Sequence, residues 1–387
     1  MASIAKRPDG RWRARYRDPS GHEHAKHFDR KIDAQRWLNE TTASIITGQY
    51  VDPHAGKITF REYAEAWRTA QVHRPSSSAH VETMLRRHAY PILGDKPLSG
   101  IRPSEVQMWV RGLSTRLAPS TVGVVHGLVA AAFKAAIRDR KVMGSPCDGT
   151  KLPQKAPREV MPLETRTVGA LAEALPTRYR ALVLLSAGTG LRQGECFGLS
   201  VDRSGLRPPS PRPMLRVDRQ LVLVQGRAPF LGPPKTTASY RTVPLPRVVV
   251  AAVAAHLAAF PALAQQVECQ DAGSKTSTSS VELLFTDEDG LPLRRTAFSR
   301  VWRAAVKAAG APIDTTFHDL RHYYASLLIR HGESVKVVQK RLGHATAAET
   351  LDTYSHLWPD SEDRTREAVD DVLGVAPADY RRTADQL

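Results

Sequence analysis

The stretch FHDLRHYYASLLIRHGESVKVVQKRLGHATAAETLDTY, residues 317–354, carries three features that point to one anionic group. His318 and Arg321 lie three residues apart, on one face of a predicted helix. A Leu-Gly-His turn ends at His344, and Tyr354 closes the stretch. Arginine offers a planar set of donors that stays charged, histidine carries a donor or a proton, and tyrosine offers a hydroxyl nucleophile that needs no metal. Such groups suit a dianionic transition state with a covalent protein intermediate.

Two segments upstream add to this set. Residues 188–195, GTGLRQGE, predict a tight glycine turn that presents Arg192, and Glu195 can hold that arginine by a charge-assisted bond. Residues 232–237 predict a second turn, with Lys235 at its tip. These segments offer two further cations and one carboxylate.

Each residue has an ordinary structural explanation when it is taken alone. An HxxR pair occurs on many amphipathic helices, a tyrosine near a helix end is usually half-buried, and a turn lysine usually faces solvent. A metal site is a poor alternative, because the histidines form neither an HExxH pair nor a Cys/His set with ligand spacing. The order of the pieces along the chain is the feature that favours function.

The ordered set resembles the tyrosine recombinases, specifically the phage integrases. Their box is His-x-x-Arg, then Leu-Gly-His, then a Tyr with a His two residues further on, and residues 354–356 read YSH here. Gly-Leu-Arg-x-x-Glu around Arg192 is similar to the family's first arginine motif. Residues 235–245 match the family pattern Lys-Thr-x-x-Ser-x-Arg-x-Val-Pro-Leu. The spacing from His344 to Tyr354 is one residue longer than in some members.

The resemblance implies a mechanism. Tyr354 would attack a DNA phosphate, giving a 3′-phosphotyrosyl link and a free 5′-hydroxyl. His318 would assist proton transfer from the tyrosine, and Lys235 would protonate the leaving 5′-oxygen. Bond energy is kept in the phosphotyrosine, so no ATP, metal or other cofactor is expected. The remaining catalytic residues would hold the non-bridging oxygens, where charge grows: Arg192, Arg321 and His344.

The resemblance also implies a biological role and partners. The chain would integrate a mobile element such as a viral genome, and with a partner protein excise it, by strand exchange between double-stranded DNA attachment sites. Four copies would act together on DNA, and a host DNA-bending protein and a directionality factor are further candidate partners. Two other classes stay open. A type IB topoisomerase shares the chemistry but has little use for an arm-binding domain, and a non-catalytic DNA-binding regulator would explain only the charge.

Composition agrees with a polyanionic partner. The 387 residues carry a net charge of +16, and residues 57–157, with 16 basic and 7 acidic side chains, are the most basic segment. The three cysteines have no paired spacing, which favours a reducing compartment and argues against disulfides or structural zinc. The longest apolar run, Val248 to Ala255, is too short to cross a bilayer. We therefore expect a cytoplasmic protein with no membrane partner.

The N-terminal segment predicts a second DNA contact. Residues 10–17, GRWRARYR, alternate strictly, a second strand can follow at residues 22–28, and Asp29 is expected to cap a helix. A solvated edge strand shows the same charge alternation. The resemblance favours DNA, because many lambda-type integrases begin with such a sheet, which binds arm sites away from the crossover point. The outward face carries the candidate contacts Arg11, Arg13, Arg15 and Arg17.

Helical periodicity dominates the rest of the chain, with prolines at the breaks. Residues 265–280, which include SKTSTSS, are predicted to be a flexible insertion. Two helices are expected to begin at polar caps: Ser120 to Lys141, capped by Ser120-Thr121, and Thr296 to Ala309, capped by Thr296. A last helix, Asp360 to Leu373, is expected after Tyr354. The other predicted helices are Phe60 to Ala70, Ser78 to Tyr90, Pro103 to Leu113 and Arg178 to Ala187, and the strands are Met214 to Val224, Tyr240 to Leu245 and Leu283 to Thr286.

The expected fold is a multidomain α+β protein. Residues 1–55 would form an arm-type DNA-binding domain, a small three-stranded sheet plus a helix. Residues 57–150 would form an all-helical core-binding bundle, and a proline-rich basic linker would follow it. Residues 158–375 would form a mainly α catalytic domain with a small antiparallel sheet, and residues 376–387 a tail.

Overall fold

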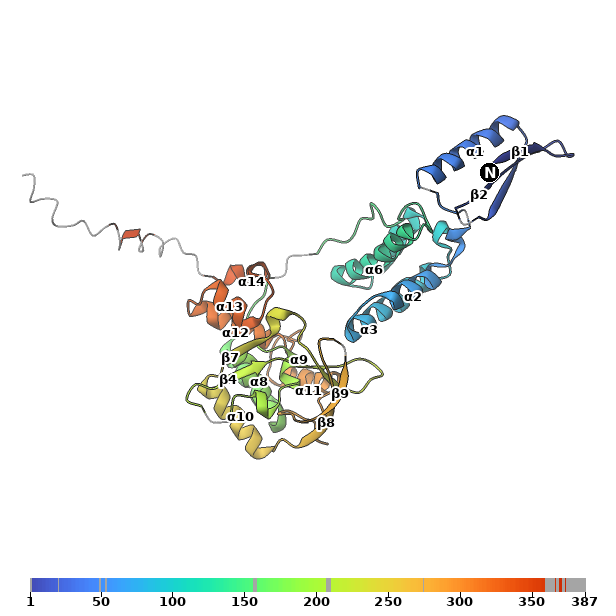
Figure 1. Ribbon diagram of the computed structural model, residues 1–387. Helices are drawn as coiled ribbons and strands as arrows, with labels where there is room; N and C mark the ends of the chain where they lie inside the picture. Colours follow the sequence, from blue (N-terminus) through green and yellow to red (C-terminus); the bar gives the residue numbers. More distant parts are fainter. Residues whose placement is uncertain are drawn as a thin grey trace, which may run out of the picture. The chain divides into compact units, whose positions relative to one another are not determined.

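The computed structural model describes residues 2–358 apart from 20, 49, 53, 156–158, 207–209 and 274, and beyond 358 only residues 366, 369, 370 and 373. The chain divides into two compact units, Met1–Ala156 and Pro157–Leu387, whose elements are labelled in Figure 1. The first unit contains two separate hydrophobic cores, one beneath the N-terminal sheet and one among helices. The division into three domains therefore stays a prediction. The α+β fold class is confirmed.

The N-terminal sheet has three antiparallel strands in the order β1 (Ser3–Lys6), β2 (Trp12–Arg17) and β3 (Glu23–Phe28). Ala14 and Tyr16 of β2 are buried on the side of helix α1 (Lys31–Ile46), and the arginines of the strand face outward, as the alternation predicts. The expected cap is wrong, because Arg30 is the N-cap and makes no side-chain bond to the helix. The Asp29 carboxylate lies 3.4 Å from Arg11 instead.

The helical part of the first unit surrounds a core that includes Phe60, Phe133 and Trp109. The apolar face of α6 lies in this core, although this helix is long and apolar enough, by length and composition, to cross a membrane. Its predicted cap is wrong, because Ala118 is the N-cap and Pro119 occupies the first turn. The helices are α2 (Phe60–Ala70), α3 (Pro75–Met84), α4 (Tyr90–Leu93), α5 (Pro103–Ser114) and α6 (Pro119–Arg138).

The helix predicted over residues 78–90 is interrupted. It begins at Pro75, ends at Met84 and continues as a π-helical turn over Leu85–Ala89. Pro91 explains the interruption, because proline lacks an amide hydrogen and clashes with the carbonyl four residues before it. The indole of Trp109 donates a hydrogen bond of 2.8 Å to the His88 carbonyl in this turn.

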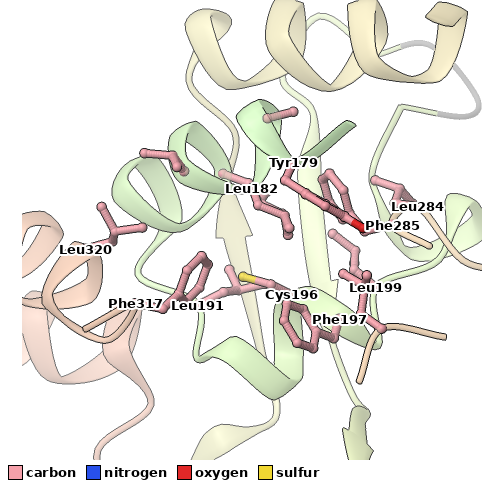
Figure 2. Close-up of a cluster of buried hydrophobic side chains, with 14 of the residues drawn as sticks. Tyr179, Leu182, Leu191, Cys196, Phe197, Leu199, Leu284, Phe285, Phe317 and Leu320 are labelled. Atoms are coloured by element: carbon pink, nitrogen blue, oxygen red, sulfur yellow. The ribbon is translucent and has the colours of Figure 1, made fainter. Parts of the chain in front are cut away.

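The second unit is mainly helical and holds the largest core (Figure 2). In Figure 2, Leu191 and Phe317 lie with Cys196 and Phe197 in one cluster, and Leu320 lies beside them. These core residues adjoin Arg192, His318 and Arg321 in the sequence, so the core fixes where the site residues emerge. The helices are α7 (Thr165–Ala174), α8 (Thr177–Thr189), α9 (Gln193–Phe197), α10 (Arg247–Ala259), α11 (Arg295–Ala308), α12 (Asp319–Arg330), α13 (Val335–Leu342) and α14 (Ala347–Tyr354).

Two small sheets accompany these helices. β4 (Met214–Val217) pairs antiparallel with β7 (Arg241–Pro244). A four-stranded sheet has the order β5 (Gln220–Val222), β6 (Phe230–Gly232), β8 (Ala264–Gln270) and β9 (Thr276–Glu282). The single strand predicted over residues 214–224 is therefore two strands in different sheets.

Other predictions in this unit are also wrong. The flexible insertion at residues 265–280 is the β8–β9 hairpin, which is anchored by buried Val267 and Val281 while its Ser and Thr residues face outward. β-Branched threonine suits a strand, so a polar composition alone did not identify a loop. The strand predicted at 283–286 forms only isolated bridges. Helix α11 has Arg294 as its N-cap, not Thr296. The helix expected at 360–373 and the tail fall outside the described stretch, apart from four isolated residues.

Candidate active site

The first arginine is presented by a glycine turn, as predicted. Helix α8 ends at Gly190, which has a left-handed φ of +67° and donates its N–H to the Ser186 carbonyl at 2.8 Å. A Cβ on this glycine would lie 2.5 Å from Tyr324, so no larger residue fits. The chain reverses there, and Arg192 becomes the N-cap of α9 with its side chain 28% exposed.

The Glu195 carboxylate is hydrogen-bonded to two arginines, Arg192 and Arg241. It accepts hydrogen bonds from the backbone N–H of Arg192 at 2.9 Å and from its Nη1 at 3.1 Å, as predicted. It also accepts from both terminal nitrogens of Arg241, at 3.1 and 2.8 Å. Burial alone would raise the pKa of Glu195, but Arg241 and Arg192 hold it below the usual range, so the carboxylate stays charged.

Arg241 received no role from the sequence. Besides Glu195, it bonds to the Arg341 carbonyl through Nε at 2.9 Å and to the Ser239 carbonyl at 3.1 Å. Its side chain is only 4% exposed. Strand alternation could have indicated that Arg241 is buried. It lies two residues from buried Val243 on strand β7, so the two side chains point to the same face.

Arg321 joins two distant turns. Its guanidinium donates to the Gly190 carbonyl through Nη1 and to the Leu342 carbonyl through Nη2, at 2.7 Å each, and the residue is 1% exposed. Burial and then repulsion from Arg192 lower the pKa of Arg321 to about 9, which leaves it charged at neutral pH. The buried cation thus ties the Arg192 turn to the turn that carries His344.

The Leu-Gly-His turn forms as predicted. Helix α13 ends at Gly343, which has φ +67°, and a Cβ there would lie 3.0 Å from the Ala238 carbonyl. His344 is buried, and its Nδ1 lies 2.8 Å from the Thr350 hydroxyl. Desolvation, helped by the charge of Arg321, lowers the pKa of His344 to about 3. The ring is therefore neutral at neutral pH.

Tyr354 ends helix α14 and is 1% exposed. Its ring stacks nearly parallel on that of His344, with centroids 6.4 Å apart. Its Oη lies 2.8 Å from Nδ1 of His322, a residue without a predicted role. Burial raises the pKa of Tyr354 to about 12.

The role of His318 in proton transfer from the tyrosine stays a prediction. His318 is the N-cap of α12, and within the described residues no hydrogen bond links it to Tyr354. Its ring packs edge-on against the His322 ring, with centroids 4.8 Å apart. The two histidines are four residues apart on one helix, so helical spacing alone could not decide which one meets the hydroxyl.

Lys235 is exposed and lies between β6 and the short 3-10 helix Thr237–Ser239. Thr236 and Ser239 share a hydroxyl hydrogen bond of 2.9 Å, and Arg192 reaches the Ser239 hydroxyl at 3.4 Å. These contacts connect Thr236, which follows Lys235, to Arg192 through the Ser239 hydroxyl.

The remaining predicted residues lie elsewhere. Arg13, Arg15 and Arg17 belong to β2 of the first unit, and Arg11 precedes that strand. Among the residues that the structure describes, one group has an arrangement that could hold a metal, Asp18 with His24 and Asp52, also in the first unit. The described active-site residues do not form such a group.

Comparison with known proteins covers nearly the whole chain. The model of the phage integrase family matches residues 163–360, that of the phage integrase N-terminal domain matches 2–47, and that of the phage integrase central domain matches 60–151. The integrase of Mycobacterium phage D29 is 26% identical over 97% of this chain and 98% of its own. The putative prophage phiRv2 integrase of Mycobacterium tuberculosis is 28% identical over 90% of this chain and 89% of its own.

Solved structures share the fold. The Tn1549 transposon integrase in complex with transposon right end DNA has a TM-score of 0.64 and 19% identity, over 82% of this chain and 100% of its own. A lambda integrase tetramer bound to a Holliday junction has a TM-score of 0.59 and 16% identity, over 93% of this chain and 95% of its own. The chain therefore belongs to the phage integrase family and is a site-specific tyrosine recombinase.

Proposed function

We propose that this chain integrates a mobile element by strand exchange between DNA attachment sites, through a 3′-phosphotyrosyl intermediate, and excises it with a partner protein. The observation that carries the proposal is the cluster around Tyr354, in which the buried tyrosine lies beside neutral His344 and within the field of buried Arg321 and partly exposed Arg192. Arg321 and its two carbonyl bonds connect the segments that carry Arg192 and His344.

The residues have separate tasks in this mechanism. Tyr354 attacks phosphorus, and the charge that grows on the non-bridging oxygens is stabilised by Arg192, Arg321 and His344. The phosphate approaches from the side of Arg192, because this guanidinium is partly exposed while Arg321 is buried. Lys235 gives a proton to the leaving 5′-oxygen. Glu195 holds Arg192 by a charge-assisted hydrogen bond, and His318, the exposed N-cap of α12, assists proton transfer from the tyrosine.

The first unit supplies DNA binding. We assign residues 57–150 to the crossover site, since they belong to the most basic segment, and the outward arginines of β2 to separate arm sites. The DNA complex of the Tn1549 integrase and the tetrameric lambda integrase support double-stranded DNA and further copies of this chain as partners. A host DNA-bending protein, a directionality factor and a cytoplasmic location belong to the same proposal.

Covalent capture tests the function without a known attachment site. The full chain is incubated with a pool of nicked duplexes of random sequence, denatured, and the DNA that stays bound is sequenced. We expect a 3′-linked adduct on a recurring sequence, here named the capture duplex. Tyr354→Phe should bind the same duplex and form no adduct, because it lacks only the hydroxyl.

The matched control is Tyr323→Phe, which removes a hydroxyl that lies 3.1 Å from that of Thr165, and this variant should still form the adduct. An adduct from Tyr354→Phe would assign the nucleophile to another tyrosine. Specific binding without any adduct from the wild-type chain would favour a DNA-binding regulator.

A further inference from the structure

We propose that Nδ1 of His322 accepts the proton of Tyr354 during DNA cleavage, a role that rests on the function proposed above. The sequence motifs give this histidine no task, because it follows Arg321 outside the His-x-x-Arg pair. The inference comes from its position against the reacting atom.

The geometry is that of a direct proton path. Nδ1 of His322 lies 2.8 Å from Oη of Tyr354, and the two rings meet at 64° with centroids 5.6 Å apart. Tyr354 is 1% exposed, whereas His322 is half-buried. A proton leaving the buried hydroxyl therefore has an imidazole beside it, and that imidazole reaches the surface of the unit.

The charges around the pair are consistent with this transfer. Burial lowers the pKa of His322; the nearby Asp319 carboxylate partly opposes this shift, and the Arg321 charge adds to it. The ring is therefore neutral at neutral pH and can accept a proton. Burial raises the pKa of Tyr354 to about 12, so the phenol does not ionise by itself at that pH. The His318 ring touches the His322 ring from the preceding turn, and His344 stacks on Tyr354 from the end of α13.

The step balances. As the bond between Oη and phosphorus forms, the Tyr354 proton moves to Nδ1 of His322, and the bond from phosphorus to the 5′-oxygen breaks. That oxygen takes a proton from Lys235. In the rejoining step the incoming 5′-hydroxyl loses its proton to the lysine amine, and His322 returns the proton to Oη as the phosphotyrosine breaks.

The test first replaces His322, the proton acceptor, and then makes the Tyr354 phenol more acidic, so that cleavage depends less on an acceptor. His322→Asn keeps a polar atom near the Nδ1 position but cannot take a proton. Single-turnover cleavage of the capture duplex should slow by about 10²–10⁴-fold, with DNA affinity unchanged. Placing 3,5-difluorotyrosine, a more acidic phenol, at position 354 should restore a large part of this loss in His322→Asn and have little effect in the wild-type background.

His318→Asn is the matched control, because its ring is adjacent but unbonded to the tyrosine. Difluorotyrosine should not restore cleavage in that variant. A near-wild-type rate for His322→Asn, or a loss that difluorotyrosine leaves unchanged, would overturn the proposal, and rescue confined to His318→Asn would transfer the role to His318. Loss of the wild-type adduct itself would instead reject the recombinase function.

A measurement on the folded chain covers the case in which His322→Asn does not fold. The ¹⁵N resonance of Nδ1 in His322 should shift on Tyr354→Phe, which removes its hydroxyl partner. His331 on the same helix, whose Nδ1 contacts the Leu327 carbonyl, should not shift. An unchanged His322 resonance would reject the contact.

Discussion

Arginine is used in opposite ways in β2 and in the active site. In β2, the side chains of Arg13 and Arg15 are 44% and 52% exposed, and both lie near the partly exposed carboxylate of Glu23. In the site, Arg241 and Arg321 are 4% and 1% exposed. Both donate to backbone carbonyls, and Arg241 also donates to buried Glu195.

The active-site guanidinium groups are held in fixed positions, whereas those of β2 stay accessible to solvent. A buried guanidinium fixed by carbonyls needs no reorganisation when charge develops on a phosphate nearby. An exposed guanidinium is screened by salt, and it contributes to DNA affinity by releasing counterions. If the proposed function holds, the same residue type supplies preorganisation in one region and salt-dependent affinity in the other.

Lys235 tests whether burial alone separates the two regions, because this lysine is exposed and yet is proposed to protonate the leaving oxygen. Lys235→Ala should slow cleavage of the capture duplex by about 10²–10⁴-fold with little change in affinity. A duplex with a 5′-bridging phosphorothiolate, whose sulfur leaves without a proton, should restore the rate. If that substrate does not restore cleavage, the lysine is a DNA contact and not the acid.

Glu195→Gln should destabilise the second unit by about 3–5 kcal/mol, because it leaves the buried charge of Arg241 uncompensated. Hydrogen exchange in peptides from α8 and α9 measures this loss locally. The matched variant is Glu23→Gln, whose partners Arg13 and Arg15 are exposed, and its effect on the β-sheet should stay within about 0.5 kcal/mol. Equal losses in the two regions would erase the distinction.

The buried site should also be sensitive to acid. The folded-state pKa of His344, about 3, lies below the unfolded value of about 6.5, so the unfolded chain binds the proton more tightly. Stability from this group is complete above about pH 6.5 and is lost as the pH falls, by roughly 2 kcal/mol at pH 5. Unfolding in urea from pH 7 to 5 should show this slope, and His344→Asn should reduce it. His331→Asn, exposed at the end of α12, should leave the slope in place.

The smallest effect on cleavage is expected in β2. Changing Arg11, Arg13, Arg15 and Arg17 together to Ala should leave cleavage of the capture duplex unchanged, as should deletion of residues 1–55. Recombination on a full attachment site should fall strongly, because arm binding raises the local concentration of protomers. The slope of log affinity against log salt for arm DNA should drop by up to about 4. Full recombination by the quadruple variant, with its sheet still folded by circular dichroism, would make β2 a solvated edge strand.

Much of the site could be predicted from local pattern. Glycine at 190 and at 343 predicted turns, and both turns present the expected arginine and histidine. The alternation of β2 predicted its faces, and the spacing of Glu195 from Arg192 predicted their bond. These features depend on backbone geometry within a few residues, which the sequence specifies directly.

The features of the site that the sequence did not predict depend on contacts between segments far apart in the chain. His322 meets Tyr354 only because the end of α14 is brought to α12, and Arg241 meets Glu195 only because a residue of β7 is brought to α9. Neither approach is encoded in spacing along one element. The β8–β9 hairpin was missed for a related reason, since its polar strands are fixed by two buried valines, Val267 and Val281, on separate strands.

Helix α12 carries Arg321 and His322 in its first turn, and each residue added to a helix rotates the side chains after it by about 100° relative to those before it. A one-residue insertion between Arg321 and His322 would therefore rotate one of them relative to the other, so that Arg321 could not keep both carbonyls while His322 kept the tyrosine. The exposed residues 271–273, which follow β8, carry no active-site group, so the chain can change length there at little cost. Natural variation in length among descendants of this gene should accumulate at the hairpin and be absent from the first turn of α12.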